Sequence, residues 1–407
     1  MEEKQEHPLL AEMLTPEFLK QFKNSQDLNN FIDQLFTKGM ERMLEGELDS
    51  HLGYTKHSPE GINSGNSRNG KTIKTIKSKR GEFVIEVPRD RKGTFDPVLI
   101  PKRSRFIDGV EDIIISLYAR GMSIRDIETQ VREIYGINVS DATISNITAR
   151  VHASVIEWQS RPLSKVYYVV WMDGIVFKVR QNGKVINKTI YLAVGLNAHG
   201  FKEVLGMWLG ENESAAFWVA VLNDLKSRGV EDILITCTDN LKGFTDAIIS
   251  TFRQSVTQIC VVHQIRNTLR FVVWKDKRKF MTDLKAIYNA PNKQVAEKAL
   301  EQLDVTWGSK YPHAIKSWKA NWDNLTHFFD YHLEIRKMIY TTNLIENLNG
   351  KIRKYTNNKL SFPDDQAILK AVYLALREIT KKWDKAVQNW PLIANQFLTM
   401  FEGRAKK

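Results

Sequence analysis

Cysteine and long hydrophobic runs are both scarce in this 407-residue sequence. The two cysteines, Cys237 and Cys260, exclude a disulfide scaffold and a four-thiolate zinc site, and they fit a reducing compartment. The densest apolar run, residues 166–172, is far shorter than the roughly 20 residues that cross a bilayer. The first residues are acidic and polar, so they lack the basic and then apolar order of a signal peptide. We therefore expect a cytoplasmic protein without a membrane partner.

Acidic residues are also scarce in comparison with basic residues. The chain has 59 Lys and Arg residues against 47 Asp and Glu residues, which gives a formal net charge of +12. A basic excess of this size points to a polyanionic partner, with nucleic acid first and an anionic membrane second. Hydrophobic residues make up 43% of the chain, so a sizeable core can form and wholesale disorder is excluded. The length predicts two or three folded units.

The charge changes sign along the first quarter of the chain. Residues 1–60 contain 6 basic and 12 acidic residues, whereas residues 61–110 contain 12 and 5. Apolar residues within 9–52 recur at helical spacing, which predicts one or two helices, the second capped by Ser25 or Asp27. A helix pair this short cannot bury its own apolar face. It packs either on the rest of the chain or on a second copy, as a dimerisation module.

The basic segment places its cations around one small β element. Gly81–Pro88 alternates like a strand, Asp90–Gly93 can turn, and Phe95–Ile100 is expected to return as the partner strand. Cations accompanied by Gly, Ser and Asn favour contact with a phosphate backbone over a merely solvated surface. Such contacts supply affinity without reading the base sequence. The residues that we assign to DNA contact here are Arg68, Lys71, Arg89, Arg91, Lys102, Arg103 and Arg105.

Residues 108–151 predict three helices with short connections. The first spans Val110–Arg120, the second runs over Ser123–Tyr135, and the third begins at a Ser140 cap. A glycine turn and a capped third helix are typical of a helix-turn-helix, in which the start of the last helix faces the major groove. An ordinary three-helix bundle is the alternative. The candidate DNA contacts of the third helix are Ser140, Asp141, Ser145, Asn146 and Arg150.

From residue 165 onward, strands and helices alternate. An Asn-Gly turn at residues 182–183 joins the first two strands as a hairpin. Three antiparallel strands, followed by two parallel strands with helical connections, predict an α/β fold with a ribonuclease-H-like mixed five-stranded sheet. The expected strand segments are 166–172 with 176–179, 189–196, 202–209, 232–238 and 256–262.

Two aspartates directly follow buried strands of this sheet. Asp173 ends the first strand and Asp239 ends the fourth. Because these strands are adjacent in the predicted topology, the two carboxylates should converge. Paired carboxylates bind Mg²⁺ through oxygen, and two such ions can catalyse in-line displacement at a phosphodiester. The simpler interpretation of Asp239 is a cap for the helix that follows it.

A third carboxylate is expected on a helix after the fifth strand. Residues 272–338 predict an all-helical insertion, and the next helix carries Glu346 in its second turn. Glu346 is the favoured third ligand. Asn343 and Asn349 lie three residues on either side and share its helical face. Arg353 lies two turns further on, within reach of a phosphate.

Several neighbouring residues have competing interpretations. Glu334 and Asp246 are the rivals for third ligand, Glu334 being the stronger of the two. Cys260 and His263 have Cys-x2-His spacing, but zinc needs three or four ligands, so we interpret Cys260 as a buried strand residue. His263 at a strand end either positions a phosphate or serves as a satisfied structural histidine.

The predicted insertion is rich in tryptophan and begins with cations. Most of its tryptophans are expected in the core, while one is a candidate for stacking on a base. The four are Trp274, Trp307, Trp318 and Trp322. The cations that we expect to follow DNA backbone are Lys275, Lys277, Arg278 and, after Glu346, Lys351.

Nearly the whole chain resembles bacterial insertion-sequence transposases of the Mutator type. The family implies an Asp-Asp-Glu triad on a ribonuclease-H-like fold with a helical insertion, and its positions fall on Asp173, Asp239 and Glu346. It also implies recognition of terminal inverted repeats, a dimeric assembly, target-site duplication, and a copy-out route through a circular intermediate. The matching stretches are His51–His57, Asn66–Gly70, Val87–Arg91, Pro101–Arg103, Val139–Ser145, Met172–Gly174, Thr238–Gly243, Cys260–His263 and Thr342–Asn349.

We therefore expect a DDE transposase that cleaves and joins DNA with two Mg²⁺ ions, for which Mn²⁺ can substitute. Its partners are double-stranded DNA, as terminal repeats and target, and a second copy in a homodimer associated with the nucleoid. A stand-alone ribonuclease-H-like nuclease and a non-catalytic DNA-binding regulator are the alternatives. The expected domains are an acidic helical arm (1–60), a basic β-containing segment (61–107), a helix-turn-helix domain (108–160), a split catalytic domain (165–271 and 339–390), the helical insertion (272–338) and a C-terminal tail (391–407).

Overall fold

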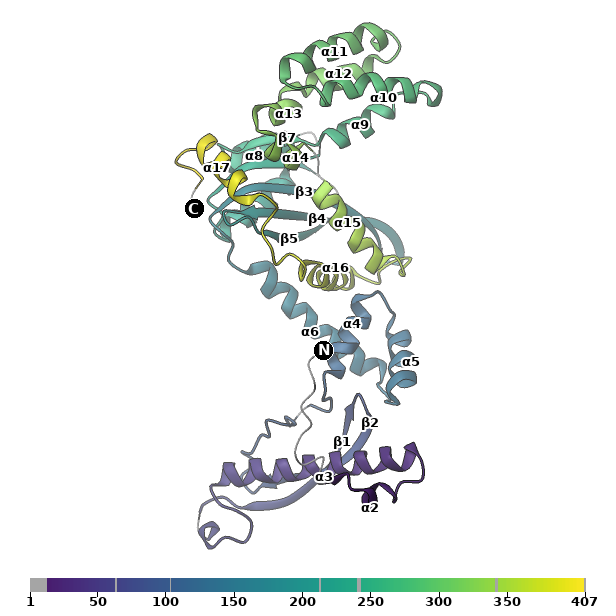
Figure 1. Ribbon diagram of the computed structural model, residues 1–407, viewed down its shortest axis with the longest axis vertical. Coiled ribbons are helices and arrows are strands. Elements are labelled where there is room, and N and C mark those ends of the chain that lie inside the picture. Colours follow the sequence, from purple (N-terminus) through teal and green to yellow (C-terminus); the bar gives the residue numbers. More distant parts are fainter. Residues whose placement is uncertain are drawn as a thin grey trace. The chain divides into compact units, whose positions relative to one another are not determined.

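The chain forms two compact units in the computed structural model (Figure 1). Unit 1 comprises Met1–Ile115 and Ile124–Ile147, and unit 2 comprises Ser116–Ser123 and Thr148–Lys407. No helix in the described part of the chain is long and apolar enough to cross a membrane. The structure describes residues 13–62, 64–102, 104–211, 214–239, 243–340 and 343–405.

Unit 1 is built around one long helix. The short helix α2 (Pro16–Leu19) precedes α3 (Ser25–Leu52). The cap of α3 is Asn24, whose side chain accepts a hydrogen bond from the Asp27 amide at 3.0 Å. The prediction of Ser25 or Asp27 as the cap was wrong, because both residues already lie inside the helix that follows the extended backbone of Asn24.

One face of α3 packs on a β-hairpin. A single 3-10 turn, η1 (Pro59–Gly61), leads to the antiparallel strands β1 (Arg68–Ser78) and β2 (Gly81–Asp90). This packing covers one face of the acidic helix, whereas Leu35 and Met43 on α3 are 50% and 58% exposed. Self-association through the exposed face stays a prediction. The core between helix and hairpin consists of Met40, Leu44, Ile76, Phe83, Ile85 and Ile100.

The hairpin uses a different partner strand from the one predicted. The strand at Gly81–Pro88 pairs with β1, which precedes it, and Phe95–Ile100 forms no strand. Pro97 lies in that segment and lacks the amide hydrogen that a strand ladder needs. The turn between β1 and β2 is stabilised by Ser78, whose Oγ accepts a hydrogen bond from the Arg80 amide at 3.0 Å.

Three helices follow the hairpin close to the predicted positions. They are α4 (Val110–Ala119), α5 (Ile124–Tyr135) and α6 (Asp141–Ser160), and α6 is longer than the sequence pattern indicated. Ser140 caps α6, since its Oγ accepts a hydrogen bond from the Thr143 amide at 3.3 Å. The division between the two units falls within α4 and α6.

A five-stranded mixed sheet forms the centre of unit 2. Its strand order is β5-β4-β3-β6-β7. The pairs β3–β4 and β4–β5 are antiparallel, whereas β3–β6 and β6–β7 are parallel. The mixed five-stranded sheet predicted from the sequence is therefore confirmed. The strands are β3 (Val166–Gln181), β4 (Lys184–Asn197), β5 (Lys202–Gly210), β6 (Asp232–Thr238) and β7 (Val256–Ile259).

Helices cover both faces of this sheet. Tyr167 and Tyr168 on β3 point to opposite faces, because side chains alternate along a strand. Tyr167 belongs to the core that the sheet forms with α7 (Ala215–Ser227) and α8 (Phe244–Thr251). Tyr168 contacts two aromatic rings of α17 (Trp390–Met400), at centroid distances of 5.5 and 4.9 Å.

Between β7 and α17 the described chain is helical. Residues 272–338 contain helices and no strand, in agreement with the expected secondary structure. Trp307 and Trp318 are only 7% and 1% exposed, and Trp318 Nε1 donates to Thr268 Oγ1 at 2.8 Å. The elements are α9 (Val261–Leu269), α10 (Trp274–Tyr288), α11 (Lys293–Trp307), α12 (Pro312–Ala320), α13 (Trp322–Thr326), η2 (His327–Asp330), α14 (Leu333–Ile339), α15 (Asn343–Thr356) and α16 (Asp365–Thr380).

Candidate functional site

Asp173 lies on β3, and Asp239 directly follows β6. The parallel pairing of these strands extends to Trp171 opposite Cys237. Two residues further along each strand stand Asp173 and Asp239, so both follow the same end of the β3–β6 pairing. Both aspartates are half-buried. Asp173 does not end its strand as predicted, because β3 keeps its pairing with β4 as far as Gln181 after it has parted from β6.

Asp173 is joined to helix α15 by a buried amide. Its Oδ1 accepts a hydrogen bond from the Gly174 amide, and its Oδ2 accepts one from Asn349 Nδ2, both at 2.9 Å. Asn349 is 7% exposed, and its Oδ1 is a buried oxygen that has no hydrogen-bond partner in the structure. Leaving such an oxygen without a partner costs free energy. The arrangement therefore presents a carboxylate and an unsatisfied amide oxygen side by side.

Glu346 lies in the first turn of α15, one turn before Asn349. Arg266 donates to both of its carboxylate oxygens, at 2.7 and 3.2 Å, and His263 Nε2 lies 3.0 Å from Oε1. The Glu346 side chain is 23% exposed, whereas that of Arg266 is 58% exposed. The carboxylate is thus held by one exposed arginine and one mostly buried histidine.

His263 and Arg266 both come from α9. His263 lies in the first turn of that helix and not at a strand end, because β7 stops at Ile259 and Cys260 is the residue that caps α9. Arg266 was missed by sequence reasoning. Its signal was the spacing of three residues from His263, which puts both side chains on one face of a helix.

The segment before α15 is tied to the ends of the central strands. Three backbone carbonyl groups in residues 338–340 accept hydrogen bonds from groups of β3, β6 and α9. These bonds bring Glu346 to the sheet although more than 100 residues separate it from both aspartates. The pairs are Trp171 Nε1 to Met338 at 3.2 Å, Cys237 Sγ to Ile339 at 3.6 Å, and the Val261 amide to Tyr340 at 3.1 Å.

The donor set suits a hard divalent cation, although its members are not gathered for one. Carboxylate and amide oxygens are the ligands that Mg²⁺ takes, and the unsatisfied Oδ1 of Asn349 adds to the two aspartates. Within the described ranges, no three His, Cys, Asp or Glu side chains lie close enough together to hold a metal ion. Glu346 instead forms its ion pair with Arg266.

The other predicted residues of this region lie at the surface. Asn343 and Arg353 are exposed on α15, and the exposed Lys351 lines a pocket of about 340 Å³ together with Lys202. Burial lowers the pKa of Lys202, and the charge of Lys351 lowers it further. A phosphate would relieve the repulsion between these two ammonium groups.

The two rival carboxylates lie elsewhere. Glu334 pairs with Lys337 within α14 at 3.8 Å, and Asp246 is exposed on α8.

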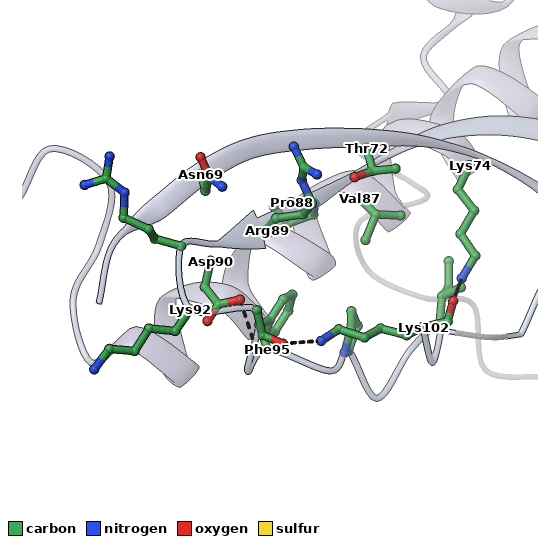
Figure 2. Close-up of a pocket in the computed structure, with 14 residues that line it drawn as sticks. Asn69, Thr72, Lys74, Val87, Pro88, Arg89, Asp90, Lys92, Phe95 and Lys102 are labelled. Atoms are coloured by element: carbon green, nitrogen blue, oxygen red, sulfur yellow. Dashed lines mark hydrogen bonds between the residues drawn. The ribbon is translucent and has the colours of Figure 1, made fainter. Parts of the chain in front are cut away.

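A basic pocket of about 380 Å³ lies between β2 and the loop that follows it (Figure 2). Lys74 reaches from β1 toward this loop, and its Nζ donates to the Pro101 carbonyl at 3.0 Å. Lys102 Nζ donates to the Gly93 carbonyl at 2.5 Å. Burial lowers the pKa of Lys74, and the nearby Arg105 lowers it further. The cations that line the pocket are Lys74, Arg89, Arg91, Lys92 and Lys102.

Both carboxylate oxygens of Asp90, which lines this pocket, accept hydrogen bonds. Asp90 is 4% exposed and accepts hydrogen bonds from Asn66 Nδ2, from the Thr94 amide and hydroxyl, and from the Phe95 amide, at 2.8 to 3.2 Å. Burial alone would raise the pKa of Asp90, but the hydrogen bonds from Asn66 and Thr94 outweigh it and hold the pKa well below its usual range. Asp90 therefore shapes the loop and leaves the cations at the surface.

Other predicted DNA-contact residues of the hairpin are already paired. Arg68 forms an ion pair with Asp49 and lies over the Tyr54 ring at 5.0 Å. Lys71 contacts Glu86 at 3.0 Å and Glu45 at 3.1 Å, and its hydrogen bonds to them raise its pKa. Arg89, Arg91, Lys102 and Arg105 are exposed, and Arg103 lies outside the described residues.

The start of α6 presents polar side chains to solvent. Ser140, Asp141, Asn146 and Arg150 are exposed, and Ser145 is half-buried. At the start of α10, Lys275 and Arg278 are exposed, while Lys277 Nζ lies 5.9 Å from the centre of the Trp274 ring.

Comparisons with known proteins address the whole chain. The family model described as "Transposase, Mutator family" matches residues 10–386. The "Transposase for insertion sequence element ISRM3" of Rhizobium meliloti is 42% identical over 379 residues, covering 92% of this chain and 94% of its own. The corresponding protein for element IS905 of Lactococcus lactis is 34% identical, covering 87% of this chain and 90% of its own.

A solved chain of the Drosophila P element transposase strand transfer complex covers 68% of this chain at 11% identity. Its TM-score of 0.37 is below the level at which a common fold follows. The family match and the sequence relatives, by contrast, extend over both units. The chain belongs to the Mutator family of transposases.

Proposed function

We propose that this chain is a DNA transposase that cleaves DNA at the ends of its insertion sequence and joins those ends to new DNA. The single observation that carries the proposal is the convergence of Asp173 on β3 with α15, the helix of Glu346, through the Asn349 hydrogen bond at 2.9 Å. Membership of the Mutator family supports it, as do relatives whose names describe transposases for insertion sequence elements. The strand order β5-β4-β3-β6-β7 supports a ribonuclease-H-like catalytic domain.

In this proposal, Asp173, Asp239 and Glu346 would hold two Mg²⁺ ions, or Mn²⁺ in their place. When bound, the ions would activate a water or hydroxyl nucleophile and stabilise the leaving oxygen of a phosphodiester. Asn349 orients Asp173 by donating to its Oδ2. Arg266 and His263 hold the Glu346 carboxylate on the α9 side of the site. Arg266 is also a cation within reach of DNA phosphate once it releases Glu346.

The reaction proceeds by two attacks at phosphorus. Water cleaves the phosphodiester at the element's end and frees a 3′-hydroxyl, which then attacks a second phosphodiester and displaces its 3′ oxygen. Both steps exchange one phosphorus–oxygen bond for another, so no covalent bond to the protein forms. A copy-out route through a circular intermediate would use the same two steps.

The DNA contacts are divided between positioning and recognition. The basic pocket next to β2 and the cations of α10 fit the phosphate backbone, where Lys and Arg act as point charges. A helix-turn-helix made by α4, α5 and α6 would set Asp141, Ser145 and Asn146 in the major groove of the terminal inverted repeats. A homodimer would hold both ends of the element. The six domains expected from the sequence stay a prediction.

The test uses purified protein and a labelled duplex with one end of the element, read as an inverted repeat beside the gene. Reactions contain Mg²⁺ or EDTA, and nicked and joined strands are separated on a denaturing gel. Asp239→Asn should abolish both products without weakening repeat binding, whereas Asp246→Asn on α8 should cut and join normally.

Retention of cleavage by Asp239→Asn would overturn the carboxylate assignment. Cleavage that ignores the repeat would favour a nuclease instead. Repeat binding with no cleavage of any end pair, in either metal, would favour a DNA-binding regulator.

A further inference from the structure

One large aromatic side chain of the helical region remains in solvent. Trp274, the first residue of α10, is 86% exposed, and its neighbours Phe271 and Val273 are 53% and 49% exposed. The other tryptophans of residues 272–338 are covered: Trp307 and Trp318 are buried, and Trp322 is half-buried. We call Phe271, Val273 and Trp274 the aromatic edge. Because these side chains are largely exposed, they contribute little to the core of this region.

The exposed rings of the aromatic edge have polar neighbours. Lys277 Nζ lies 5.9 Å from the centre of the Trp274 ring. The Phe271 ring lies 6.0 Å from the ring of the exposed His313, with 32° between the ring planes. Exposed aromatic rings at a surface fit another flat ring better than they fit an aliphatic partner.

The surroundings of the aromatic edge are strongly basic. Residues 270–279 contain five cations and one acid, Asp276. Asp276 accepts hydrogen bonds from Lys310 Nζ and from the Tyr311 hydroxyl, both at 2.5 Å, so its charge is already balanced. Aromatic faces among uncompensated cations are the composition of a surface for single-stranded nucleic acid, in which bases stack on rings and cations follow the backbone.

The aromatic edge is also close to the carboxylate site. Trp274 follows Arg266 by eight residues, and Arg266 contacts Glu346 directly. Helix and turns connect Arg266 to Val272, so the eight residues span about 12 to 19 Å. Successive nucleotides of a duplex strand rise about 3.4 Å. Trp274 therefore lies about four to six nucleotides from a phosphodiester held at Glu346.

We propose that the aromatic edge takes an unpaired base of the DNA a few nucleotides from the cleavage point and stacks it on Trp274. The inference rests on the proposed function and names a substrate feature for it: an element end with one or more unpaired nucleotides. Bases inside a duplex stack on each other and offer only their edges, so this contact forms with frayed, flipped or single-stranded positions. It favours opening of the duplex at the site.

The experiment measures binding of the full chain in EDTA, so that no cleavage occurs. The probes are a labelled single strand with 2-aminopurine at one position, the same end as a blunt duplex, and the duplex with six unpaired terminal nucleotides. Trp274→Ala should weaken binding to the single strand and to the unpaired end by about 5- to 150-fold. Its binding to the blunt duplex should change less than twofold.

Two further variants separate stacking from folding. Trp274→Phe should restore most of the binding and the quenching of 2-aminopurine, because a benzene ring still stacks. Val305→Ala, at a residue of α11 that is 80% exposed, should bind all three probes like the wild type. Circular dichroism should give one unfolding temperature for all of the proteins, because Trp274 makes no core contact.

Each outcome decides between the inference and the proposed function. Equal binding of the unpaired end by wild type and Trp274→Ala, with specific duplex binding retained, would overturn the inference and leave the transposase proposal standing. Equal weakening on all three probes would also overturn it, because the contact would then be a general one. A wild-type protein that binds none of the probes would overturn both.

Discussion

The two units use buried or half-buried carboxylates in opposite ways. Asp90 in unit 1 is 4% exposed and accepts four hydrogen bonds from neutral groups of Asn66, just before the hairpin, and of Thr94 and Phe95, in the loop after it. Glu346 in unit 2 is 23% exposed and is held by Arg266 and His263, which come from a helix 80 residues earlier in the sequence. One carboxylate is saturated by its neighbours, and the other is held by partners that solvent also reaches.

The difference indicates which carboxylate is structural and which is available for chemistry. The donors to Asp90 include the backbone amides of Thr94 and Phe95, which would lose this partner if Asp90 were removed. The Arg266 side chain is 58% exposed, so it regains much of its hydration when it lets go of Glu346, and such ion pairs contribute little net stability. Under the proposed function, the Glu346 carboxylate has to exchange Arg266 for another partner, and the second arrangement allows that exchange.

The strongest way to break this comparison is to change Glu346. Glu346→Gln should lower the rate of strand cleavage at least about a thousandfold, equivalent to about 4 kcal/mol of transition-state stabilisation, because a neutral amide is a poor ligand for Mg²⁺. Its unfolding free energy should change by less than about 1 kcal/mol, since the lost ion pair is partly exposed. Cleavage is measured on the denaturing gel, and stability by urea unfolding. Glu334→Gln on α14 is the matched control, and a large loss of stability in Glu346→Gln would make Glu346 a structural residue.

Substitution of Asp90 should have the opposite effect to that of Glu346, with a large loss of stability. Asp90→Ala is expected to destabilise unit 1 by about 3 kcal/mol, because it removes charge-assisted hydrogen bonds and leaves buried amides unpaired. Hydrogen exchange of the full chain, followed by mass spectrometry, should show faster exchange at Thr94 and Phe95. Asp96→Ala removes one hydrogen bond, from the Lys102 amide at 2.9 Å, at an exposed residue, and should change exchange far less. Equal effects of the two variants would contradict a structural role of Asp90.

The pH dependence sharpens the assignment of Asp90. Its pKa in the folded chain is held below its usual range, whereas the unfolded value is about 3.9. The stabilisation is therefore fully present above the unfolded pKa and is lost as the pH falls through the folded pKa. The difference in unfolding free energy between wild type and Asp90→Ala should stay constant from pH 7 to about pH 5 and shrink below about pH 4. Shrinkage already between pH 7 and pH 5 would contradict the low pKa.

The sequence predicted the elements of unit 2 better than the details of its site. Long buried strands and an Asn-Gly turn give strong local signals, so the mixed sheet could be predicted. That Asp173 lies inside a 16-residue strand could not, because β3 continues only through its pairing with β4. Arg266 was missed because its partner lies 80 residues away.

In unit 1 the sequence pattern missed one strand. The lysine-rich segment that forms β1 was interpreted only as cation clusters for DNA contact, which stays a prediction, whereas it also pairs with β2 and buries Ile76. The pairing of Arg68 with Asp49 and of Lys71 with Glu45 likewise depends on α3 lying across the hairpin. Neither pairing is visible in local sequence patterns, because each joins residues about 20 positions or more apart.

The smallest expected effect distinguishes exposed from paired cations within the hairpin. Arg89→Gln removes an exposed charge that lines the basic pocket, and it should lower the slope of log binding constant against log salt concentration by about 0.9. Lys71→Gln should leave the slope nearly unchanged, because Glu45 and Glu86 already neutralise Lys71. Both slopes come from fluorescence titrations of one duplex at several salt concentrations. Equal slopes for the two variants would mean that DNA displaces the acidic partners of Lys71, and the division of the hairpin into structural and DNA-facing cations would fail.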